Sequence, residues 1–343
     1  MESRDMACGI YTLANDAFYD QLVALLNSIE VNVNKNIPIC VIPYDDRVKK
    51  VKQEIDSRGN VFLFDDNDSI QRWEDFANKV WSAHPEAKRS RLSRNRFYKS
   101  NTIRKWCAFD GPFNKFVFYD VDSLAMKPID DVFEKLEIYD FVFDDWEHRK
   151  PDAISFLDFL LIEKASPFKK EEIRARQHGV DFFGSRSGLF PKEEVLKIKK
   201  QLVKNDEVKW LKGLGIWDEG TIFNYMTLRS GRSLFNFTQS LNGRDRTGNC
   251  ANADPFVNID NILYSQEGLK PIHRIHYMGY LPIDFALLCR GVDVNIRYKD
   301  VFLYYRFLKN PKQRPERLKQ LNVLSETIRE AKKAIEKLKM ILK

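Results

Sequence analysis

The stretch most informative about the fold is Lys115-Phe116-Val117-Phe118-Tyr119-Asp120-Val121-Asp122. Its short apolar run is typical of a buried β-strand, and open α/β sheets bind ligands at the carboxyl ends of their strands. Side chains two residues apart in an extended chain point to the same side. Asp120 and Asp122 can therefore approach one divalent cation, which in turn can hold a diphosphate. A strand followed by an Asp-rich turn gives the same pattern, so Asp-x-Asp alone leaves both interpretations open.

Strand-like and helical patterns alternate along the chain around this stretch. The strand patterns cover residues 7–13, 37–42, 61–64, 116–119 and 139–143. An amphipathic helix is expected after the first strand, and Asn15 and Asp16 are expected to cap it. Alternating strands and helices predict an α/β fold with a mostly parallel sheet and helices on both of its faces.

Composition limits the class of protein. The chain has 343 residues, of which 43% are hydrophobic, and this is enough to bury a large core. It contains no apolar run long enough to span a membrane, and its first residues lack the apolar segment of an export signal. The five cysteines are scattered without C-x-x-C spacing, so the pattern indicates reduced thiols and neither a zinc site nor a disulfide framework. These features predict a cytoplasmic protein.

The formal net charge of +7 is concentrated in two segments. Residues 88–105 contain eight Lys or Arg and no acidic residue, whereas residues 311–343 contain ten Lys or Arg and four Glu. Localised charge of this kind indicates two positive sites, and no nucleic-acid-binding module accompanies it, so no nucleic-acid partner is expected. The first segment fits a solvated helix face and an attraction of phosphates to Arg96 and Arg104 equally well.

The end of the chain carries a heptad pattern. Its apolar residues lie three and four positions apart at Leu321, Leu324, Ile328, Ala331, Ile335, Leu338 and Leu342, and lysines surround them. Such a helix can form a coiled-coil homodimer, dock on the body of the protein, or lie on the cytoplasmic face of a membrane. The sequence thus predicts a body of residues 1–290 and a C-terminal helical extension of residues 291–343.

The order of the motifs resembles the family 8 glycosyltransferases of the GT-A fold. In that family a strand ending in Asp-x-Asp is followed by Pro or Asn, Ile, Asp and an apolar helix, as in residues 118–133. A late His-aromatic-x-Gly segment is the second family element, and His276-Tyr277-Met278-Gly279 resembles it. The resemblance implies a sheet of the GT-A type. It also implies an enzyme that transfers a sugar from a nucleotide sugar, expected to be a UDP-sugar, to an acceptor with retention of the anomeric configuration.

The resemblance also implies a site. Asp120, Asp122 and His276 would bind Mn²⁺ or Mg²⁺, and an imidazole ligand favours Mn²⁺. The implied contacts with the nucleotide sugar come from Tyr11, Thr12, Asn15, Tyr19, Arg96, Arg104, Tyr119, Asp120, Val121, Asp122, Gly184, Ser185 and Gly279. Tyr119 and Val121 would use their backbone, Gly184 and Ser185 would form a small turn beside the donor sugar, and Gly279 would let backbone approach the phosphates.

Asp218 and Glu219 resemble the Asp-Gln pair near the anomeric carbon in that family and are the implied catalytic residues. Carboxylates there can stabilise an oxocarbenium-like state, while a cation and basic residues stabilise the departing diphosphate. Both residues also fit as acids in the first turn of a helix. His276 also fits as an interior histidine hydrogen-bonded to backbone.

Three departures from the family pattern stand out. Pro282 replaces a phosphate-contacting Lys, Glu219 replaces Gln, and Phe183-Gly184-Ser185 replaces an Asn-Ser-Gly turn.

Two other functions stay open: a haloacid-dehalogenase-type phosphatase, whose nucleophile also lies in strand-Asp-x-Asp, and a catalytically inactive nucleotide-sugar-binding protein. The phosphatase class usually carries its motif on an early strand with Thr or Val four residues after the first Asp, where Leu124 stands here. The acceptor can be a carbohydrate, a lipid-linked molecule or a protein.

Overall fold

The computed structural model describes residues 6–85, 87, 100–145, 156–212, 219–239 and 247–320. Arg96, Asp218 and the heptad segment from Leu321 onward lie outside the described residues. The predictions made for them stay predictions.

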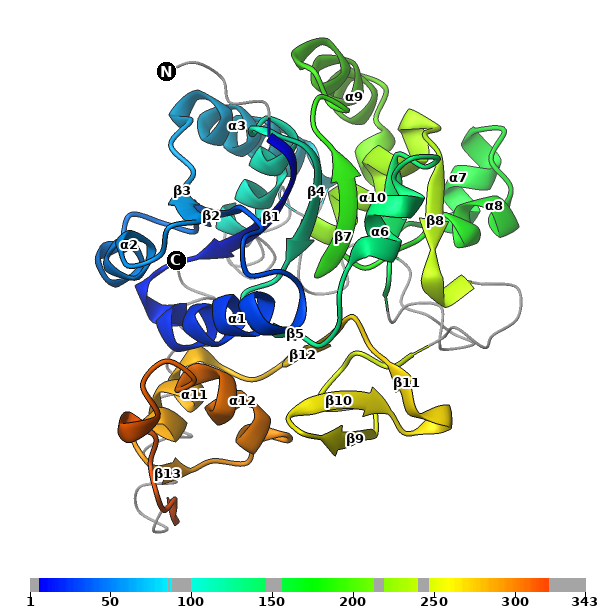
Figure 1. The fold of residues 1–343 in the computed structure, drawn as a ribbon. Coiled ribbons are helices and arrows are strands. Elements are labelled where there is room, and N and C mark those ends of the chain that lie inside the picture. Colours follow the sequence, from blue (N-terminus) through cyan, green and yellow to red (C-terminus); the bar gives the residue numbers. More distant parts are fainter. Residues whose placement is uncertain are drawn as a thin grey trace.

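A seven-stranded sheet forms the centre of the molecule (Figure 1). Its strands, in spatial order, are β3 (Val61–Leu63), β2 (Ile39–Pro43), β1 (Met6–Ala14), β4 (Phe113–Tyr119), β7 (Phe182–Arg186), β6 (Phe141–Phe143) and β8 (Leu234–Asn236). Every adjacent pair is parallel except the two that involve β7, which is antiparallel to β4 and β6. The predicted mostly parallel sheet is confirmed, and each predicted strand overlaps one of its members.

Helices cover both faces of this sheet (Figure 1). The helices α1 (Tyr19–Asn32), α2 (Lys49–Asp56) and α6 (Asp130–Lys135) pack on one face. The other face is covered by α3 (Asn67–Ala83), η2 (Ser100–Phe109), α7 (Phe159–Ala165), α8 (Lys170–Ala175), α9 (Lys192–Lys204) and α10 (Glu219–Ser230). Strand side chains alternate between the two layers, because neighbours in a strand point to opposite faces. None of the helices within the described ranges is long and apolar enough to cross a membrane.

Asn15 and Asp16 cap two different helices. The Asn15 side chain accepts a hydrogen bond from Ala17 N at 3.0 Å and so begins the short 3₁₀ turn η1 (Asp16–Phe18) that leads into α1. The Asp16 carboxylate instead accepts hydrogen bonds from three backbone N–H groups at the start of α2, that of Lys50 at 2.8 Å being the shortest. The predicted cap is therefore correct for Asn15, whereas the carboxylate of Asp16 caps the start of α2.

Phenylalanine dominates the larger core layer. Phe223 on α10 is fully buried, and its ring centroid lies 5.2 Å from that of Phe183 and 5.9 Å from those of Phe109 and Phe141. These residues come from β6, β7, η2 and α10, so one ring connects four elements. Aromatic pairs at such distances add to the free energy of burial.

Replacing Phe223 with Ala is expected to destabilise the protein by about 3–5 kcal/mol, because it removes a fully buried ring and leaves a cavity. Chemical denaturation followed by tryptophan fluorescence measures this loss. Ile138→Ala is the control, since Ile138 is 72% exposed and its removal should change stability by less than about 0.5 kcal/mol. Similar small losses for both variants would contradict this account of the core.

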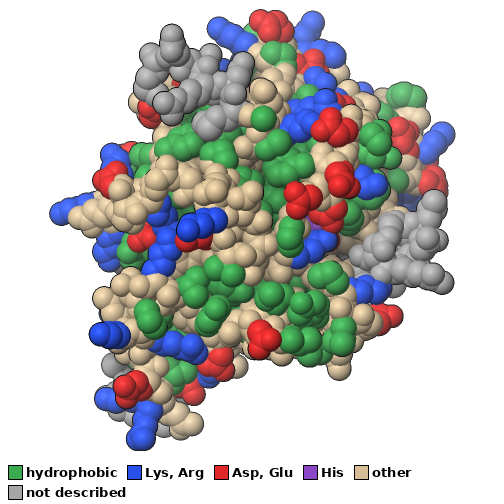
Figure 2. All heavy atoms as spheres, viewed as in Figure 1, with side chains coloured by type: hydrophobic (Ala, Val, Ile, Leu, Met, Phe, Trp, Pro, Cys, Tyr) green, Lys and Arg blue, Asp and Glu red, His purple; other side chains and the backbone are tan. Residues whose placement is uncertain are grey.

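A second group of elements lies below the sheet, against α1 (Figure 1). It comprises the ribbon of β5 (Ser123–Ala125) with β12 (Arg274–His276), the small sheet of β9 (Phe256–Ile259), β10 (Ile262–Ser265) and β11 (Lys270–Pro271), and α11 (Pro282–Cys289), β13 (Val292–Asp293), α12 (Lys299–Arg306) and β14 (Lys319–Gln320). Figure 2 shows apolar side chains gathered over β9 and β10. The cross-strand pairs Ile262–Ile259 and Tyr264–Val257 lie on the face that is not fully buried.

The predicted boundary at residue 290 falls inside one packed cluster. Phe302 and Tyr305 of α12 pack with Leu124 and Ile275, which belong to the β5–β12 ribbon. The side chain of Asn27 on α1 also donates a hydrogen bond to the Tyr305 carbonyl at 2.7 Å. Residues up to α12 therefore pack as part of the body.

Candidate functional site

Strand pairing brings the three predicted metal ligands together. Asp120 and Asp122 follow the end of β4 in a turn closed by a hydrogen bond from Ser123 N to the Asp120 carbonyl at 3.1 Å. In the β5–β12 ribbon His276 pairs with Ser123, and Tyr277 N donates to the Asp122 carbonyl at 2.9 Å. This register fixes His276 beside Asp122, although β4 and β12 lie far apart in the sequence.

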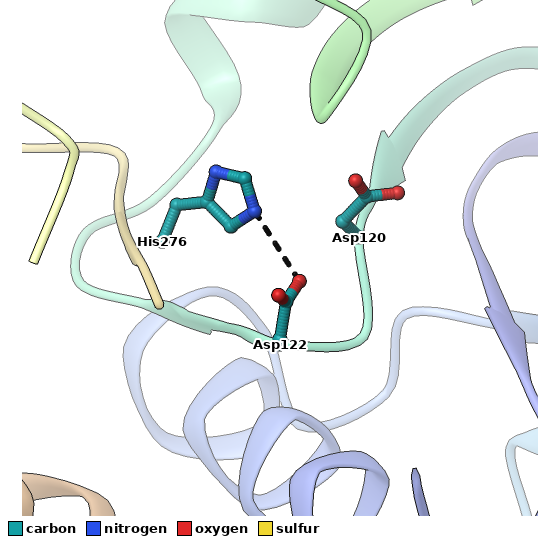
Figure 3. Close-up of side chains that lie close together, drawn as sticks. All are labelled: Asp120, Asp122 and His276. Atoms are coloured by element: carbon teal, nitrogen blue, oxygen red, sulfur yellow. Dashed lines mark ion pairs between the residues drawn. The ribbon is translucent and has the colours of Figure 1, made fainter. Parts of the chain in front are cut away.

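Figure 3 shows the His276 ring and the Asp120 carboxylate on either side of Asp122. His276 Nε2 lies 3.3 Å from Asp122 Oδ1, and one ligand atom from each of the three residues lies within 4.8 Å of the others. Ligands about 2.1 Å from a shared cation lie about 3–4.2 Å from one another, so small side-chain movements would let these residues fit Mn²⁺ or Mg²⁺. The side chains of Asp120 and Asp122 are 27% and 21% exposed, so a ligand can reach them.

The charges at this site also fit a cation. Burial raises the pKa of Asp120 to about 6, although Lys105 favours its ionised form. Burial opposes protonation of His276, but the carboxylates of Asp122 and Asp181 outweigh it and raise its pKa well above the ordinary value. The two ring nitrogens of His276 thus face carboxylates, which makes the alternative of a histidine bonded only to backbone wrong.

The site lies at a topological switch point of the sheet. β2 and β3 lie on one side of β1 and β4 lies on the other, so the strand order reverses between β1 and β4. Thr12 pairs with Tyr119, which brings the carboxyl ends of these two strands together. Open α/β sheets bind ligands in the crevice at such a point.

Lys105 also lies at the site, although no motif in the sequence distinguishes it from the other basic residues of 88–105. Its ammonium group lies 3.1 Å from Asp120 Oδ1 and 2.7 Å from Glu219 Oε1, and it donates to the Val180 carbonyl at 3.2 Å. The side chain is 1% exposed. Lys105 therefore joins a predicted metal ligand to a predicted catalytic residue.

Glu219 is the first residue of α10 and is 7% exposed. Burial opposes its ionisation, but Lys105 holds the pKa of its carboxyl below the ordinary value. The structure thus brings Glu219 next to the predicted metal ligands as a carboxylate. Its place in the first turn of α10 also agrees with the helix-dipole interpretation, and its catalytic role stays a prediction.

Arg104 does not face the aspartates. Its Nε lies 2.6 Å from Glu74 Oε1 on α3, and its Nη1 donates to the Pro43 carbonyl at the end of β2 at 3.0 Å. The basic residue that contacts Asp120 is its neighbour Lys105. The predicted contact of Arg104 with the donor phosphates stays a prediction, and Lys105 is the basic residue that the structure places against Asp120.

The predicted nucleoside-binding residues differ in accessibility. Asn15 lies at the end of β1, and its amide donates to Asp45 Oδ2 at 2.8 Å. The buried hydroxyl of Thr12 has no hydrogen-bond partner in the described part of the chain. Tyr11 and Tyr119 are wholly buried, with ring centroids 4.8 Å from those of Phe113 and Phe182. The side chains of these two tyrosines are core residues, which leaves only their backbone for a ligand.

Three other residues predicted to contact the nucleotide sugar are Tyr19, Val121 and Gly279. The Tyr19 hydroxyl donates to Glu54 Oε2 at 3.1 Å, so Tyr19 bridges α1 and α2. Val121 is 7% exposed and lies between the two aspartates. Gly279 follows β12 with a φ of +88°, a conformation that L side chains rarely adopt.

Gly184 and Ser185 lie inside β7 and not in a turn beside the site. Gly184 pairs with Val117 of β4, and a Cβ at this position would lie 2.6 Å from Val132 Cγ1, because α6 packs closely there. The Ser185 hydroxyl donates to the Asp140 carbonyl at 3.0 Å. The residue of this segment that reaches the site is Asp181, whose carbonyl accepts a hydrogen bond from Asp120 N at 2.8 Å.

A buried His273 lies next to the site and pairs with two carboxylates. Its Nδ1 is 2.6 Å from Asp144 Oδ2 and its Nε2 is 3.1 Å from both oxygens of Asp131. Burial lowers the pKa of His273, but its hydrogen bonds to Asp131 and Asp144 outweigh burial and raise it above the ordinary value. The folded protein therefore holds the His273 proton more tightly than the unfolded chain does.

Wild-type stability is expected to fall as the pH rises from about 6.5, the unfolded-state value for His, through the higher folded-state pKa of His273. The contribution is fully present below that window, and its slope is at most about 1.4 kcal/mol per pH unit. Urea denaturation at several pH values should show a shallower fall for His273→Gln than for wild type. Equal pH slopes for the two proteins would contradict the expected proton uptake.

No protein-family model and no curated protein matches the chain. Among solved structures, the chain is similar to the bifunctional glycosyltransferase WbbM in its apo form, with a TM-score of 0.50 and 14% identity over 91% of this chain and 52% of WbbM. This chain thus spans about half the length of that protein.

Two further solved structures are similar to the chain. They are the galactosyltransferase LgtC in complex with donor and acceptor sugar analogs (TM-score 0.49, 12% identity, 87% of this chain and 95% of LgtC) and the glycosyltransferase GlyE of Streptococcus pneumoniae TIGR4 (TM-score 0.44, 10% identity, 88% of this chain and 60% of GlyE). At 14% identity, the likeness to WbbM shows the fold, and with the sheet described above it confirms the predicted GT-A architecture.

Proposed function

We propose that this protein is a metal-dependent, retaining glycosyltransferase that transfers a sugar from a nucleotide sugar, a UDP-sugar, to a carbohydrate, lipid-linked or protein acceptor. The observation that carries the proposal is the convergence of Asp120, Asp122 and His276 at the switch point between β1 and β4. Nucleotide ligands bind to α/β sheets at such points. WbbM, whose fold is similar, is a bifunctional glycosyltransferase, and the family 8 resemblance of both motifs agrees with this activity.

The chemistry of the donor set suits this reaction. Asp120, Asp122 and His276 would hold Mn²⁺ or Mg²⁺, and the bound cation would stabilise the negative charge of the departing diphosphate. Lys105 holds Glu219 in its ionised form close to Asp120. A carboxylate there can stabilise the positive charge that develops on the donor sugar or orient the acceptor hydroxyl. We propose Glu219 as a catalytic residue and keep Asp218, its neighbour in sequence, as a second candidate.

The proposal extends to location. A cytoplasmic enzyme would meet its nucleotide-sugar donor directly, and the basic heptad segment would bring it to a lipid-linked acceptor at the membrane surface or join two copies as a homodimer. Removal of residues 321–343 tests both roles through vesicle binding and oligomeric state.

Calorimetry with UDP, GDP and their common sugar conjugates, with and without Mn²⁺, tests the proposed function. We expect Mn²⁺-dependent binding of a uridine nucleotide by the wild type and subsequent release of UDP from one sugar conjugate. Absence of nucleotide binding by the folded protein would overturn the proposal and return attention to phosphatase assays. Tight binding of a sugar nucleotide without turnover, with a panel of acceptors present, would favour the inactive binding protein.

A further inference from the structure

We infer that Asp181 is a positioning residue for the metal site: it holds His276 so that Nε2 faces Asp120 and Asp122, and Arg274 in turn holds Asp181. This inference rests on the proposed function, because it assumes that His276 is a metal ligand. Asp181 belongs to neither of the motifs that carry the family resemblance.

The two nitrogens of the His276 ring face different carboxylates. Nε2 lies 3.3 Å from Asp122 Oδ1, whereas Nδ1 lies 3.2 Å from Asp181 Oδ2. In Figure 3 the nitrogen joined to Asp122 points toward the aspartates, and the other nitrogen points away from them. A histidine can bind a cation through one nitrogen while its other N–H donates to a carboxylate, and such a carboxylate fixes the orientation and the tautomer of the ring.

Arg274, which lies on β12 together with His276, holds Asp181 in place. The Arg274 Nε donates to Asp181 Oδ2 at 3.1 Å, its Nη2 donates to the same oxygen, and its Nη1 donates to the Asp144 carbonyl at 2.9 Å. Arg274 is fully buried, and its guanidinium lies 4.7 Å from the centre of the Phe182 ring. Residues two apart in a strand share a face, so Arg274 and His276 both meet Asp181.

Asp181 also contacts the first aspartate through its backbone. Its carbonyl accepts a hydrogen bond from Asp120 N at 2.8 Å, which attaches the start of β7 to the end of β4. One residue thus connects the Asp120 segment with the His276 side chain.

The test compares Mn²⁺ binding, followed by electron paramagnetic resonance and calorimetry, in the wild type, Asp181→Ala, Asp181→Asn and His276→Ala, each with and without UDP. Asp181→Ala should weaken Mn²⁺ binding by about 10- to 100-fold, as loss of such a supporting carboxylate does at other metal sites. Asp181→Asn keeps an oxygen that can accept the N–H and should restore binding to within about 5-fold of the wild type.

Asp131→Asn is the matched control, because Asp131 makes the same kind of contact with a ring nitrogen of His273, a buried histidine that is not a proposed ligand. It should bind Mn²⁺ as the wild type does. Electron spin-echo modulation from a coordinated imidazole nitrogen should be present in the wild type, absent in His276→Ala and reduced in Asp181→Ala. A general loss of folding cannot mimic this pattern in samples whose circular dichroism matches the wild type.

The outcomes separate this inference from the proposed function. Wild-type Mn²⁺ affinity and nitrogen modulation in a folded Asp181→Ala would overturn the role of Asp181 and leave the metal site standing. An equal loss in Asp131→Asn would also overturn it, because it would reveal a non-local effect. Absence of Mn²⁺ binding by the wild type, with and without UDP, would overturn both this inference and the proposed metal dependence.

Discussion

Asp122→Ala is expected to lower kcat/KM for the sugar donor by at least about 10²–10³-fold, a loss of roughly 3–4 kcal/mol of transition-state stabilisation. The substitution removes one of three ligand groups, and it also removes the carboxylate that faces His276 Nε2 at 3.3 Å. His276 Nε2 would then lose this carboxylate, while Nδ1 would still face Asp181. Metal affinity and turnover should therefore fall together.

The measurement is release of UDP from the sugar nucleotide across a range of Mn²⁺ concentrations. Asp293→Ala is the control, because Asp293 pairs with Lys299 in the lower part of the molecule and its side chain is 32% exposed. The control should keep wild-type kinetics. Turnover by Asp122→Ala within about 3-fold of the wild type, at every Mn²⁺ concentration, would contradict a ligand role for Asp122.

Lys105→Met should destabilise the protein by about 3–5 kcal/mol, because it keeps most of the side-chain volume but leaves Asp120 and Glu219 without their buried cation. Removal of one partner from a buried ion pair is more costly than removal of both. The double variant Lys105→Met with Glu219→Gln should accordingly recover at least about half of the lost stability.

Denaturation midpoints of the wild type, both single variants and the double variant complete this thermodynamic cycle. A loss of less than about 1 kcal/mol in Lys105→Met would contradict the buried network, as would strict additivity of the two single changes. The same variants should also lose activity, because Glu219 would no longer be held beside Asp120.

The sequence predicts those parts of the fold that depend on a local pattern of apolar residues. The apolar run before Asp120 predicts β4, and the alternation of strands and helices predicts the parallel part of the sheet. Asp120, Asp122 and His276 could be grouped only because two separate motifs resemble one family. The structure then supplies the register of β5 with β12 that brings them within reach.

The remaining features depend on long-range packing, which a single sequence does not display. β7 was not recognised, because Gly184 interrupts its apolar pattern, and only the close approach of Val132 explains a glycine there. Arg104 and Lys105 are adjacent and both carry a positive charge, so the sequence does not distinguish them. The path of η2 decides that Lys105 faces Asp120. Likewise, no local pattern shows that α12 packs with the β5–β12 ribbon, or that its Tyr305 carbonyl accepts a hydrogen bond from Asn27 of α1.

The reversed direction of β7 has a consequence for how sequences with this fold can diverge. The chain leaves β6 near Asp145 and enters β7 after Asp181, and because Phe143 pairs with Phe183, both points lie at the edge that carries Asp120 and Asp122. The closure entropy of such an excursion grows by only about 0.6 kcal/mol for each doubling of its length. The segment between these two points can therefore change in length or sequence while the strands stay in register, so the surroundings of Asp120 and Asp122 can vary without a change of fold.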